Sequence, residues 1–198
     1  YKRQGKWVAT YAMQNGDSDG VIPFEVEGIL DLSGNPNSGT TATTDGSVVI
    51  FDNTKPELDI VRIASNNQDS TWAKVGDMIS INFIANELLI SQSANLNGQA
   101  MTISDLGSEK YLAQYEMTDL DTEGQLSFEI LITDSVGLES DPIITTSNSS
   151  QVIFDKTLPI LNQVNIQSNN QNNSSIAITG DNVTLTFVPD EPLLIDSI

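Results

Sequence analysis

Carboxylates are the side chains with which this chain could do chemistry. Its 198 residues include 27 Asp and Glu against 8 Lys and Arg, no His and no Cys, and the formal net charge is −19. Without His there is no imidazole base, Ser-His-Asp triad or His-ligated metal, and without Cys there is no thiolate nucleophile, disulfide or Cys-ligated zinc. Two uses of carboxylates remain: binding of a hard cation through oxygen ligands, and glycoside hydrolysis by a carboxylate pair.

The strong negative charge limits the partners that we expect. It repels phosphates, so the sequence predicts no nucleic-acid binding, and it disfavours an anionic membrane surface. No apolar run approaches the roughly 20 residues that cross a bilayer, so we expect no membrane insertion of this segment. Ile, Leu, Val and Phe are frequent enough to form a core, which predicts a folded chain.

The sequence repeats itself at an offset of 103 or 104 residues, and such a repeat decides the architecture before any other feature. Apolar residues and special residues such as Gly, Asp and Pro are both kept at this offset. The clearest matches are 51–56 with 154–159, 76–83 with 180–187, and 7–13 with 111–117. So many matches at one offset indicate duplication.

The phase of the repeat predicts three segments. Residues 53–155 form one complete repeat, 1–52 the C-terminal half of a preceding repeat, and 156–198 the N-terminal half of a following repeat. The chain begins at Tyr1 with neither a Met nor a signal peptide, and we expect it to be a piece of a longer tandem array. The competing interpretation is a head-to-tail polymer, in which the head half of one chain completes the tail half of its neighbour.

Alternation with period two predicts strands rather than helices. Ile79, Ile81 and Phe83 share one face of a strand, and 111–117 and 126–132 alternate in the same way. The shorter candidates are 58–64, 88–91, 99–103 and 151–154. About seven short strands in a repeat of this length are typical of an antiparallel β-sandwich.

Ser-Asn-Asn at 65–67, Tyr-x-Ala-x-Tyr at 111–115 and the two Phe-Asp-x-Thr-x-Pro segments occur in a characteristic order. This order resembles the bacterial immunoglobulin-like (Big-type) tandem repeats of large surface or secreted proteins such as adhesins. The resemblance implies an all-β fold of tandem Ig-like sandwiches, an extracellular or cell-surface location, and calcium at junctions between repeats.

One turn departs from the pattern of such repeats. Their usual Asp-x-Ala-Gly-Asn reads Asp31-Leu-Ser-Gly-Asn35 in the first half-repeat but Asp134-Ser-Val-Gly-Leu138 in the complete repeat. Since Leu138 replaces the Asn, we expect no Asn-dependent turn at Asp134.

We expect the carboxylates to gather at the two junctions between repeats. Because clustered carboxylates repel one another, a Ca²⁺ ion with about 6–8 oxygen ligands would relieve the repulsion and stiffen the junction. The upstream candidates are Asp17, Asp19, Asp52 and Glu87, with Asp134 or Asp141 in addition, and the downstream candidates are Asp119, Asp121, Glu123, Asp155 and Glu191. The alternative is that Asp-x-Asp-Gly and Asp-x-Glu-Gly are ordinary turns capped by their first Asp.

The sequence predicts a structural protein and not an enzyme, because a repeated sandwich of about 100 residues offers little room for a deep pocket. We expect a stalk, spacer or fibre segment whose partners are neighbouring repeats of the same chain or identical subunits. The alternative is an adhesive module that contacts glycan or protein, for which Trp72 is the candidate exposed aromatic residue.

Overall fold

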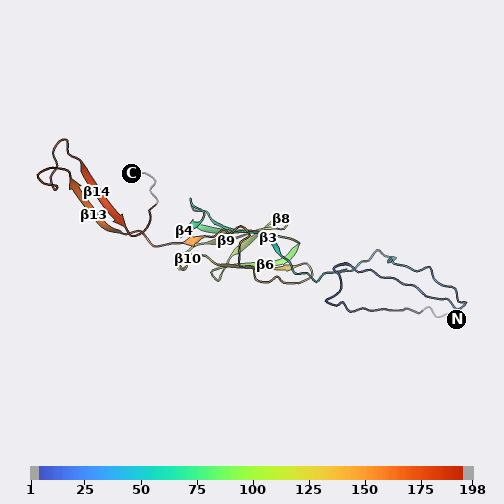
Figure 1. The fold of residues 1–198 in the computed structure, drawn as a ribbon. Helices are drawn as coiled ribbons and strands as arrows, with labels where there is room; N and C mark the ends of the chain where they lie inside the picture. Colours follow the sequence, from blue (N-terminus) through green and yellow to red (C-terminus); the bar gives the residue numbers. More distant parts are fainter. Residues whose placement is uncertain (1–4, 194–198) are drawn as a thin grey trace. The chain divides into compact units, whose positions relative to one another are not determined.

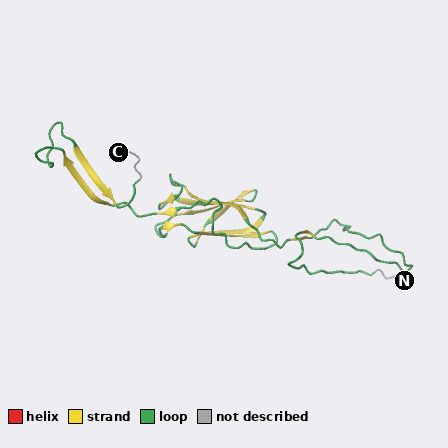
Figure 2. Ribbon diagram, viewed as in Figure 1, coloured by secondary structure: helices red, strands yellow, loops and turns green. Residues whose placement is uncertain are grey.

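The computed structural model describes residues 5–193, and none of these residues forms a helix, so none forms a helix able to span a membrane. The chain divides into two compact units, Tyr1–Phe154 and Asp155–Ile198. The first unit contains the strands β1 to β12 and the second contains β13 and β14 (Figures 1 and 2). The three-segment division at 1–52, 53–155 and 156–198 stays a prediction.

The largest sheet of the first unit has four strands. Their order is β3 (Leu58–Ser65), β5 (Met78–Ala85), β9 (Lys110–Glu116) and β8 (Thr102–Gly107), and all neighbours are antiparallel. The strand β5 lies inside this sheet, and its alternation directs Ile79, Ile81 and Phe83 into the core, where all three are fully buried. The predicted inward face of this strand is therefore confirmed.

A second sheet supplies the other side of the core. It contains β11 (Phe128–Asp134), β6 (Leu89–Leu96) and β7 (Gln99–Ala100), and a small sheet joins β10 (Gly124–Gln125), β12 (Ile153–Phe154) and β4 (Trp72–Ala73). Leu96, Ile130 and Ile132 belong to the same buried cluster as the inward face of β5. The architecture is all-β and consistent with a β-sandwich (Figure 1).

The prediction of one strand at 99–103 was wrong, because two strands of different sheets lie there. The strand β7 pairs with β6, whereas β8 pairs with β9. Between them Met101 is buried, and its N–H donates to the carbonyl of Ala94. A period-two pattern cannot reveal such a change of sheet, because alternation continues through the crossing.

The start of β11 also differs from the prediction. The expected strand at 126–132 begins at Phe128 instead, although Leu126 is buried and its N–H donates to the carbonyl of Val152. Burial and hydrogen bonding at Leu126 therefore persist without a continuous strand.

Residues 5–52 form little regular structure. The only strands described there are β1 (Gly20–Val21) and β2 (Ile50–Phe51), which pair in antiparallel fashion. No strand forms at 7–13, although the matching residues 111–117 contain most of β9. The side chains of Trp7 and Tyr11 are accordingly exposed.

The second unit is one hairpin of β13 (Leu161–Ser168) and β14 (Val183–Pro189). In this hairpin Val164 lies opposite Phe187, just as Val61 lies opposite Phe83 in the β3–β5 pair of the complete repeat. The hairpin therefore reproduces the register of its counterpart 103–104 residues earlier.

Candidate metal centre

Three carboxylates of the first unit meet beside the segment that follows β2. Asp52, Glu87 and Asp134 each bring one oxygen to within 4.8 Å of the others. Asp52 directly follows β2, Glu87 lies in the loop between β5 and β6, and Asp134 ends β11. We call this group the acidic triad.

Backbone pairing brings the triad together. Asp134 pairs with Leu89 at a bulge in the β11–β6 ladder, which places it beside the loop that contains Glu87. In the same loop the backbone N–H of Asn86 donates to the carbonyl of Glu57, and the Asn86 Oδ1 accepts from the N–H of Glu57. These two bonds hold the segment that follows Asp52 against the β5–β6 loop.

The carboxylate of Asp134 is held firmly by one of its two oxygens. Its Oδ1 accepts hydrogen bonds from the N–H groups of Val136, Gly137 and Leu138 at 2.9, 2.8 and 2.9 Å. Gly137 has a φ of 94°, which a side chain would strain. The side chain is 0% exposed, and its Oδ2 has no hydrogen-bond partner among the described residues.

The matching turn at Asp31 shows what Asp134 lacks. Asp31 Oδ1 accepts from the N–H groups of Ser33 and Asn35, and its Oδ2 accepts from the Asn35 side-chain amide at 3.0 Å. The Asn35 side-chain bond is the largest cause that lowers the pKa of the Asp31 carboxyl. Leu138 occupies the corresponding place in the complete repeat, and its side chain has no hydrogen-bond donor.

The turn at Asp134 forms without the Asn side chain. At both turns, the backbone carbonyl of the Asp accepts a hydrogen bond from the N–H of the Gly three residues later. The backbone N–H of Asp31 or Asp134 in turn donates to the carbonyl four residues later. Backbone groups therefore suffice for the turn. Loss of the Asn removes the side-chain hydrogen bond to Oδ2 of the Asp.

The electrostatic environment of the triad favours a positive charge. Partial burial raises the pKa of the Glu87 carboxyl, and the negative charges of Asp52 and Asp134 raise it further. Lys55 lies close in sequence to Asp52, but its Nζ pairs with Asp141 at 2.6 Å. The side chains of this ion pair are 54% and 86% exposed, so it contributes little stability, and Asp141 stands outside the triad.

The upstream candidate Asp17 accepts hydrogen bonds within its own turn. Asp17 accepts from the Tyr11 hydroxyl and the Gln14 N–H, and the matching Asp121 accepts from the Tyr115 hydroxyl and the Thr118 N–H. This is the capping role that formed the alternative interpretation for these motifs.

Asp19 has a different role, because it accepts from the N–H of Asn53 and the hydroxyl of Thr54. It thereby joins the region of β1 to the linker that follows β2. Asp19 is thus a structural acceptor beside the triad rather than a member of it.

The downstream candidates Asp121, Glu123, Asp155 and Glu191 match the upstream candidates at the 103–104 residue offset. Asp155 accepts from the N–H of Thr157, just as Asp52 accepts from the N–H of Thr54. Asp119, Glu123 and Glu191 each have an interaction partner. Because these candidates belong to both units, their gathering at one junction stays a prediction.

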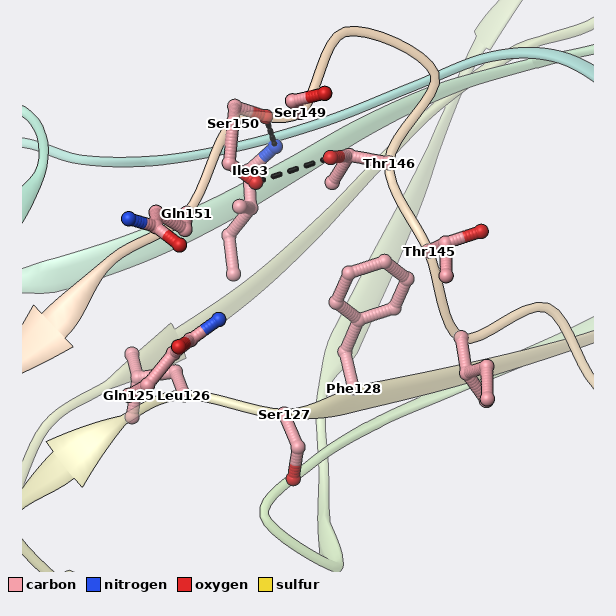
Figure 3. Close-up of a pocket in the computed structure, with 11 residues that line it drawn as sticks. Ile63, Gln125, Leu126, Ser127, Phe128, Thr145, Thr146, Ser149, Ser150 and Gln151 are labelled. Carbon is pink, nitrogen blue, oxygen red and sulfur yellow. Dashed lines mark hydrogen bonds between the residues drawn. The ribbon is translucent and has the colours of Figure 1, made fainter.

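A hollow beside β11 is lined by apolar and uncharged polar side chains. Its lining includes Ile63, Leu126, Phe128, Thr146 and Ser150 (Figure 3). The Ile63 N–H donates to the Ser150 hydroxyl oxygen at 3.0 Å, and the Thr146 hydroxyl donates to the Ser150 carbonyl at 3.0 Å. None of the lining residues is acidic or basic, so the hollow offers no acid or base for a reaction.

Comparisons with protein-family models, curated proteins and solved structures find no match for this chain. The resemblance to bacterial Ig-like repeats therefore stays a prediction from the residues quoted above.

Proposed function

We propose that this chain is a structural segment of an extracellular bacterial tandem-repeat protein, where it serves as a stalk, spacer or fibre built from Ig-like repeats. One observation supports the proposal above all others. The apolar positions that form the closed core of the complete repeat recur in both flanking segments, where their side chains are exposed.

Among the described residues, the C-terminal hairpin supplies the counterparts of β3 and β5 alone. Val164 and Phe187 are 58% and 39% exposed, whereas their counterparts Val61 and Phe83 are 3% and 0% exposed. In the complete repeat, β9 pairs with the second edge of β5, and β6 and β11 supply the opposite side of the core. The part of the second unit that the structure describes pairs the two strands of the hairpin with no such elements.

The N-terminal segment has the opposite deficiency. Trp7 is 93% exposed where its counterpart Tyr111 is 4% exposed, and the partly exposed Val26 matches the fully buried Ile130. These are the positions of β9 and β11, so this segment lacks the strands that precede them in a repeat.

The N-terminal segment thus carries the counterparts of β9 and β11, and the hairpin carries those of β3 and β5. Exposed apolar strands that are left uncovered promote aggregation, so the physical requirement is a complementary half-repeat as partner. That half belongs to a neighbouring repeat of the same polypeptide or to an identical subunit. In either arrangement, repeats joined by short Asp-x-Thr-x-Pro linkers transmit load along the chain without any catalytic site.

Force spectroscopy on a polypeptide with several consecutive copies of residues 53–155 tests this function. Each copy should unfold separately and release about 340–370 Å of chain, which is the extended length of 103 residues. A matched array with Phe83→Ala in every copy should unfold at lower force with the same step length, because that side chain is buried in the core. Irregular steps, or extension without steps, would contradict independent mechanical repeats.

A further inference from the structure

We propose that the C-terminal hairpin is a docking surface for the N-terminal segment of a second copy of this chain, and that residues 6–12 of that copy add to β14 as an antiparallel strand. The proposal rests on the proposed function, because it treats the two flanking segments as parts of Ig-like repeats. It goes further by naming the partner as an identical chain and by naming the strand that enters and its register.

The outer edge of β14 is the first half of the docking surface. Within the described residues, β14 pairs with β13 alone. In the complete repeat the matching edge of β5 is occupied by β9 across seven residue pairs, from Met78 opposite Glu116 to Ile84 opposite Lys110. A strand edge with unpaired N–H and C=O groups is a template to which an extended segment can add. The edge of β14 is therefore a site for a strand that corresponds to β9.

The internal duplication gives the register of that added strand. At the offset of 104 residues, the β5–β9 ladder transfers to 182–188 of the hairpin and 6–12 of the second copy. Phe187 then lies opposite Trp7, which reproduces the stacked aromatic pair of the β5–β9 ladder. Both side chains are exposed in the single chain. Pairing in this register would cover apolar side chains on the same face that is buried in the complete repeat.

The two segments carry almost no charge, although the whole chain has a net charge of −19. The strands β13 and β14 contain no acidic or basic residue, and 6–12 contains only Lys6. Proteins commonly protect exposed strand edges with charged side chains or Pro, and the one Pro here is Pro189 at the end of β14. The strand β3 has Asp59 and Arg62, whereas its counterpart β13 has Asn at both positions. The hairpin thus lacks the charges that would keep an identical chain from its edges.

The outer edge of β13 is the second half of the docking surface. In the complete repeat, the loop 146–150 covers the matching edge of β3. There the N–H of Val61 donates to the Ser147 hydroxyl oxygen, and the N–H of Ile63 donates to the Ser150 hydroxyl oxygen (Figure 3). An edge that is capped by hydroxyl groups has no free N–H at these two positions for another strand.

The loop 43–47 of the N-terminal segment has the same conformation as this covering loop. The Thr43 hydroxyl donates to the Ser47 carbonyl at 2.9 Å, and the corresponding bond of the complete repeat is 3.0 Å long. The N–H of Ser47 donates to Asp45 Oδ1 at 3.0 Å, against 3.1 Å for its counterpart. Gly46 has a φ of 74°, and its counterpart also has a positive φ, of 59°. The loop is therefore already formed in the shape that covers a strand edge.

Both edges of the hairpin thus find their counterparts in one segment. Thr44 and Ser47 correspond to the two Ser residues that cover β3, so their hydroxyl oxygens would accept from the N–H groups of Val164 and Ile166. The two matches are independent, because they involve opposite edges of the hairpin and different parts of the segment. Since the two docking surfaces differ from each other, successive copies can join head to tail.

The docked surface would be smaller than the interior of a complete repeat. The described residues include no strand that corresponds to β6 or β7, so docking covers the edges of the hairpin and only part of its face. Each copy also carries the same net charge of −19. We therefore expect reversible association that requires more than micromolar protein.

The first test is sedimentation velocity of the complete 198-residue chain from micromolar to millimolar concentration, at about 0.15 M salt to screen the net charge. The wild-type chain should be monomeric at the low end and associate at the high end. Ala9→Pro should prevent association, because Pro has no N–H to donate to the ladder. Residue 9 lies outside any strand of the single chain, so this substitution should leave the fold intact. The control Ala9→Ser keeps the N–H and should still associate.

A cross-link tests the register directly, because the chain has no Cys. The proposed register places Thr10 of one copy opposite Thr184 of the next, as Gln114 lies opposite Ser80. Opposite Cα atoms of antiparallel strands lie about 4.5–5.5 Å apart, which a disulfide can span. A mixture of the Thr10→Cys and Thr184→Cys chains should therefore form a mixed disulfide on oxidation. The control mixture of Thr10→Cys and Gln167→Cys should stay largely unlinked, because Gln167 lies opposite Thr184 on β13, one strand further away.

A wild-type chain that stays monomeric at every concentration would overturn the proposal, and so would association of Ala9→Pro equal to that of the wild type. Equal cross-linking in the two mixtures would also overturn it, since the contact would then have no fixed register. An internal disulfide in the monomeric double variant Thr10→Cys/Thr184→Cys, without cross-linking of the mixed single variants, would exclude a second copy as the partner. None of these results alters the unfolding steps expected of the concatenated repeats 53–155, so failure of docking and failure of the mechanical function are distinguishable.

Discussion

The equivalent residues Phe83 and Phe187 allow a direct comparison of one side chain in two environments. Phe83 is fully buried and stacks on Tyr111 with a centroid distance of 5.2 Å, whereas Phe187 is 39% exposed on the hairpin. Truncation of a buried Phe to Ala costs about 3–5 kcal/mol, because transfer free energy and packing are both lost. Phe83→Ala should therefore lower the unfolding free energy of the complete repeat by about 3–5 kcal/mol.

Phe187→Ala should have almost no effect on the same transition. Phe187 lies in the second unit, and substitutions remote from a folding unit usually change its stability by less than about 0.5 kcal/mol. Urea denaturation at micromolar concentration, followed by tryptophan fluorescence, measures both variants. Trp72 lies in β4 of the complete repeat, while Trp7 is already exposed and should report little change on unfolding.

The comparison extends to a longer chain that supplies the missing half-repeat. There Phe187 should be covered, and Phe187→Ala should cost about 3–5 kcal/mol in the unfolding of the new repeat. Equal losses from the two variants in the 198-residue chain at high dilution would refute the reasoning, because the hairpin would then be buried already. A loss at Phe187 that grows with protein concentration would instead identify an identical subunit as the covering partner.

Two further predictions concern the carboxylates. The raised pKa of Glu87 means that the folded state binds its proton more tightly than the unfolded state does, so ionisation of Glu87 disfavours folding as the pH rises above the ordinary glutamate pKa of 4.5. In EDTA, Glu87→Gln should therefore raise the melting temperature relative to wild type at pH 7 but not at pH 4, and a gain of equal size at both would contradict the assigned repulsion from Asp52 and Asp134. Asp121→Ala should lower the unfolding free energy by about 1–3 kcal/mol, because it removes the buried carboxylate that accepts from the half-buried Tyr115 hydroxyl and from the N–H of Thr118. Tyr115→Phe should cost less, about 0.5–1.5 kcal/mol in urea titrations, and the reverse order would show that the hydroxyl rather than the carboxylate maintains this turn.

Local patterns in the sequence predicted the central strands well and the boundaries less well. The pleat of a strand makes alternation a local property, so the inward face of β5 could be read from Ile79, Ile81 and Phe83. The crossing at Met101 and the late start of β11 at Phe128 depend on which strand each segment pairs with. Strands that pair can lie far apart in the sequence, and alternation within one strand does not predict which strand it pairs with.

The sequence predicted that carboxylates would form the candidate site, but only some of the predicted residues belong to the acidic triad. Asp52 and Glu87 were expected at the upstream junction and lie together, with Asp134 as the third member. Asp17 and Asp19 were expected there as well but accept hydrogen bonds from their own turn and from the linker. The replacement of Asn35 by Leu138 was the visible signal for Asp134, but only the buried geometry shows that the change affects Oδ2.

The sequence by itself determined what is local or compositional: the all-β character, the internal duplication, the turn-forming Asp residues, and the exclusion of His and Cys chemistry. Only the tertiary structure decided which carboxylates meet. The members of the triad are 35 and 47 residues apart, and the β11–β6 register together with the Glu57–Asn86 pairing brings them to one place. The structure likewise decided that Asp134 Oδ2 has no partner, because burial depends on the packing of distant segments that no local pattern records.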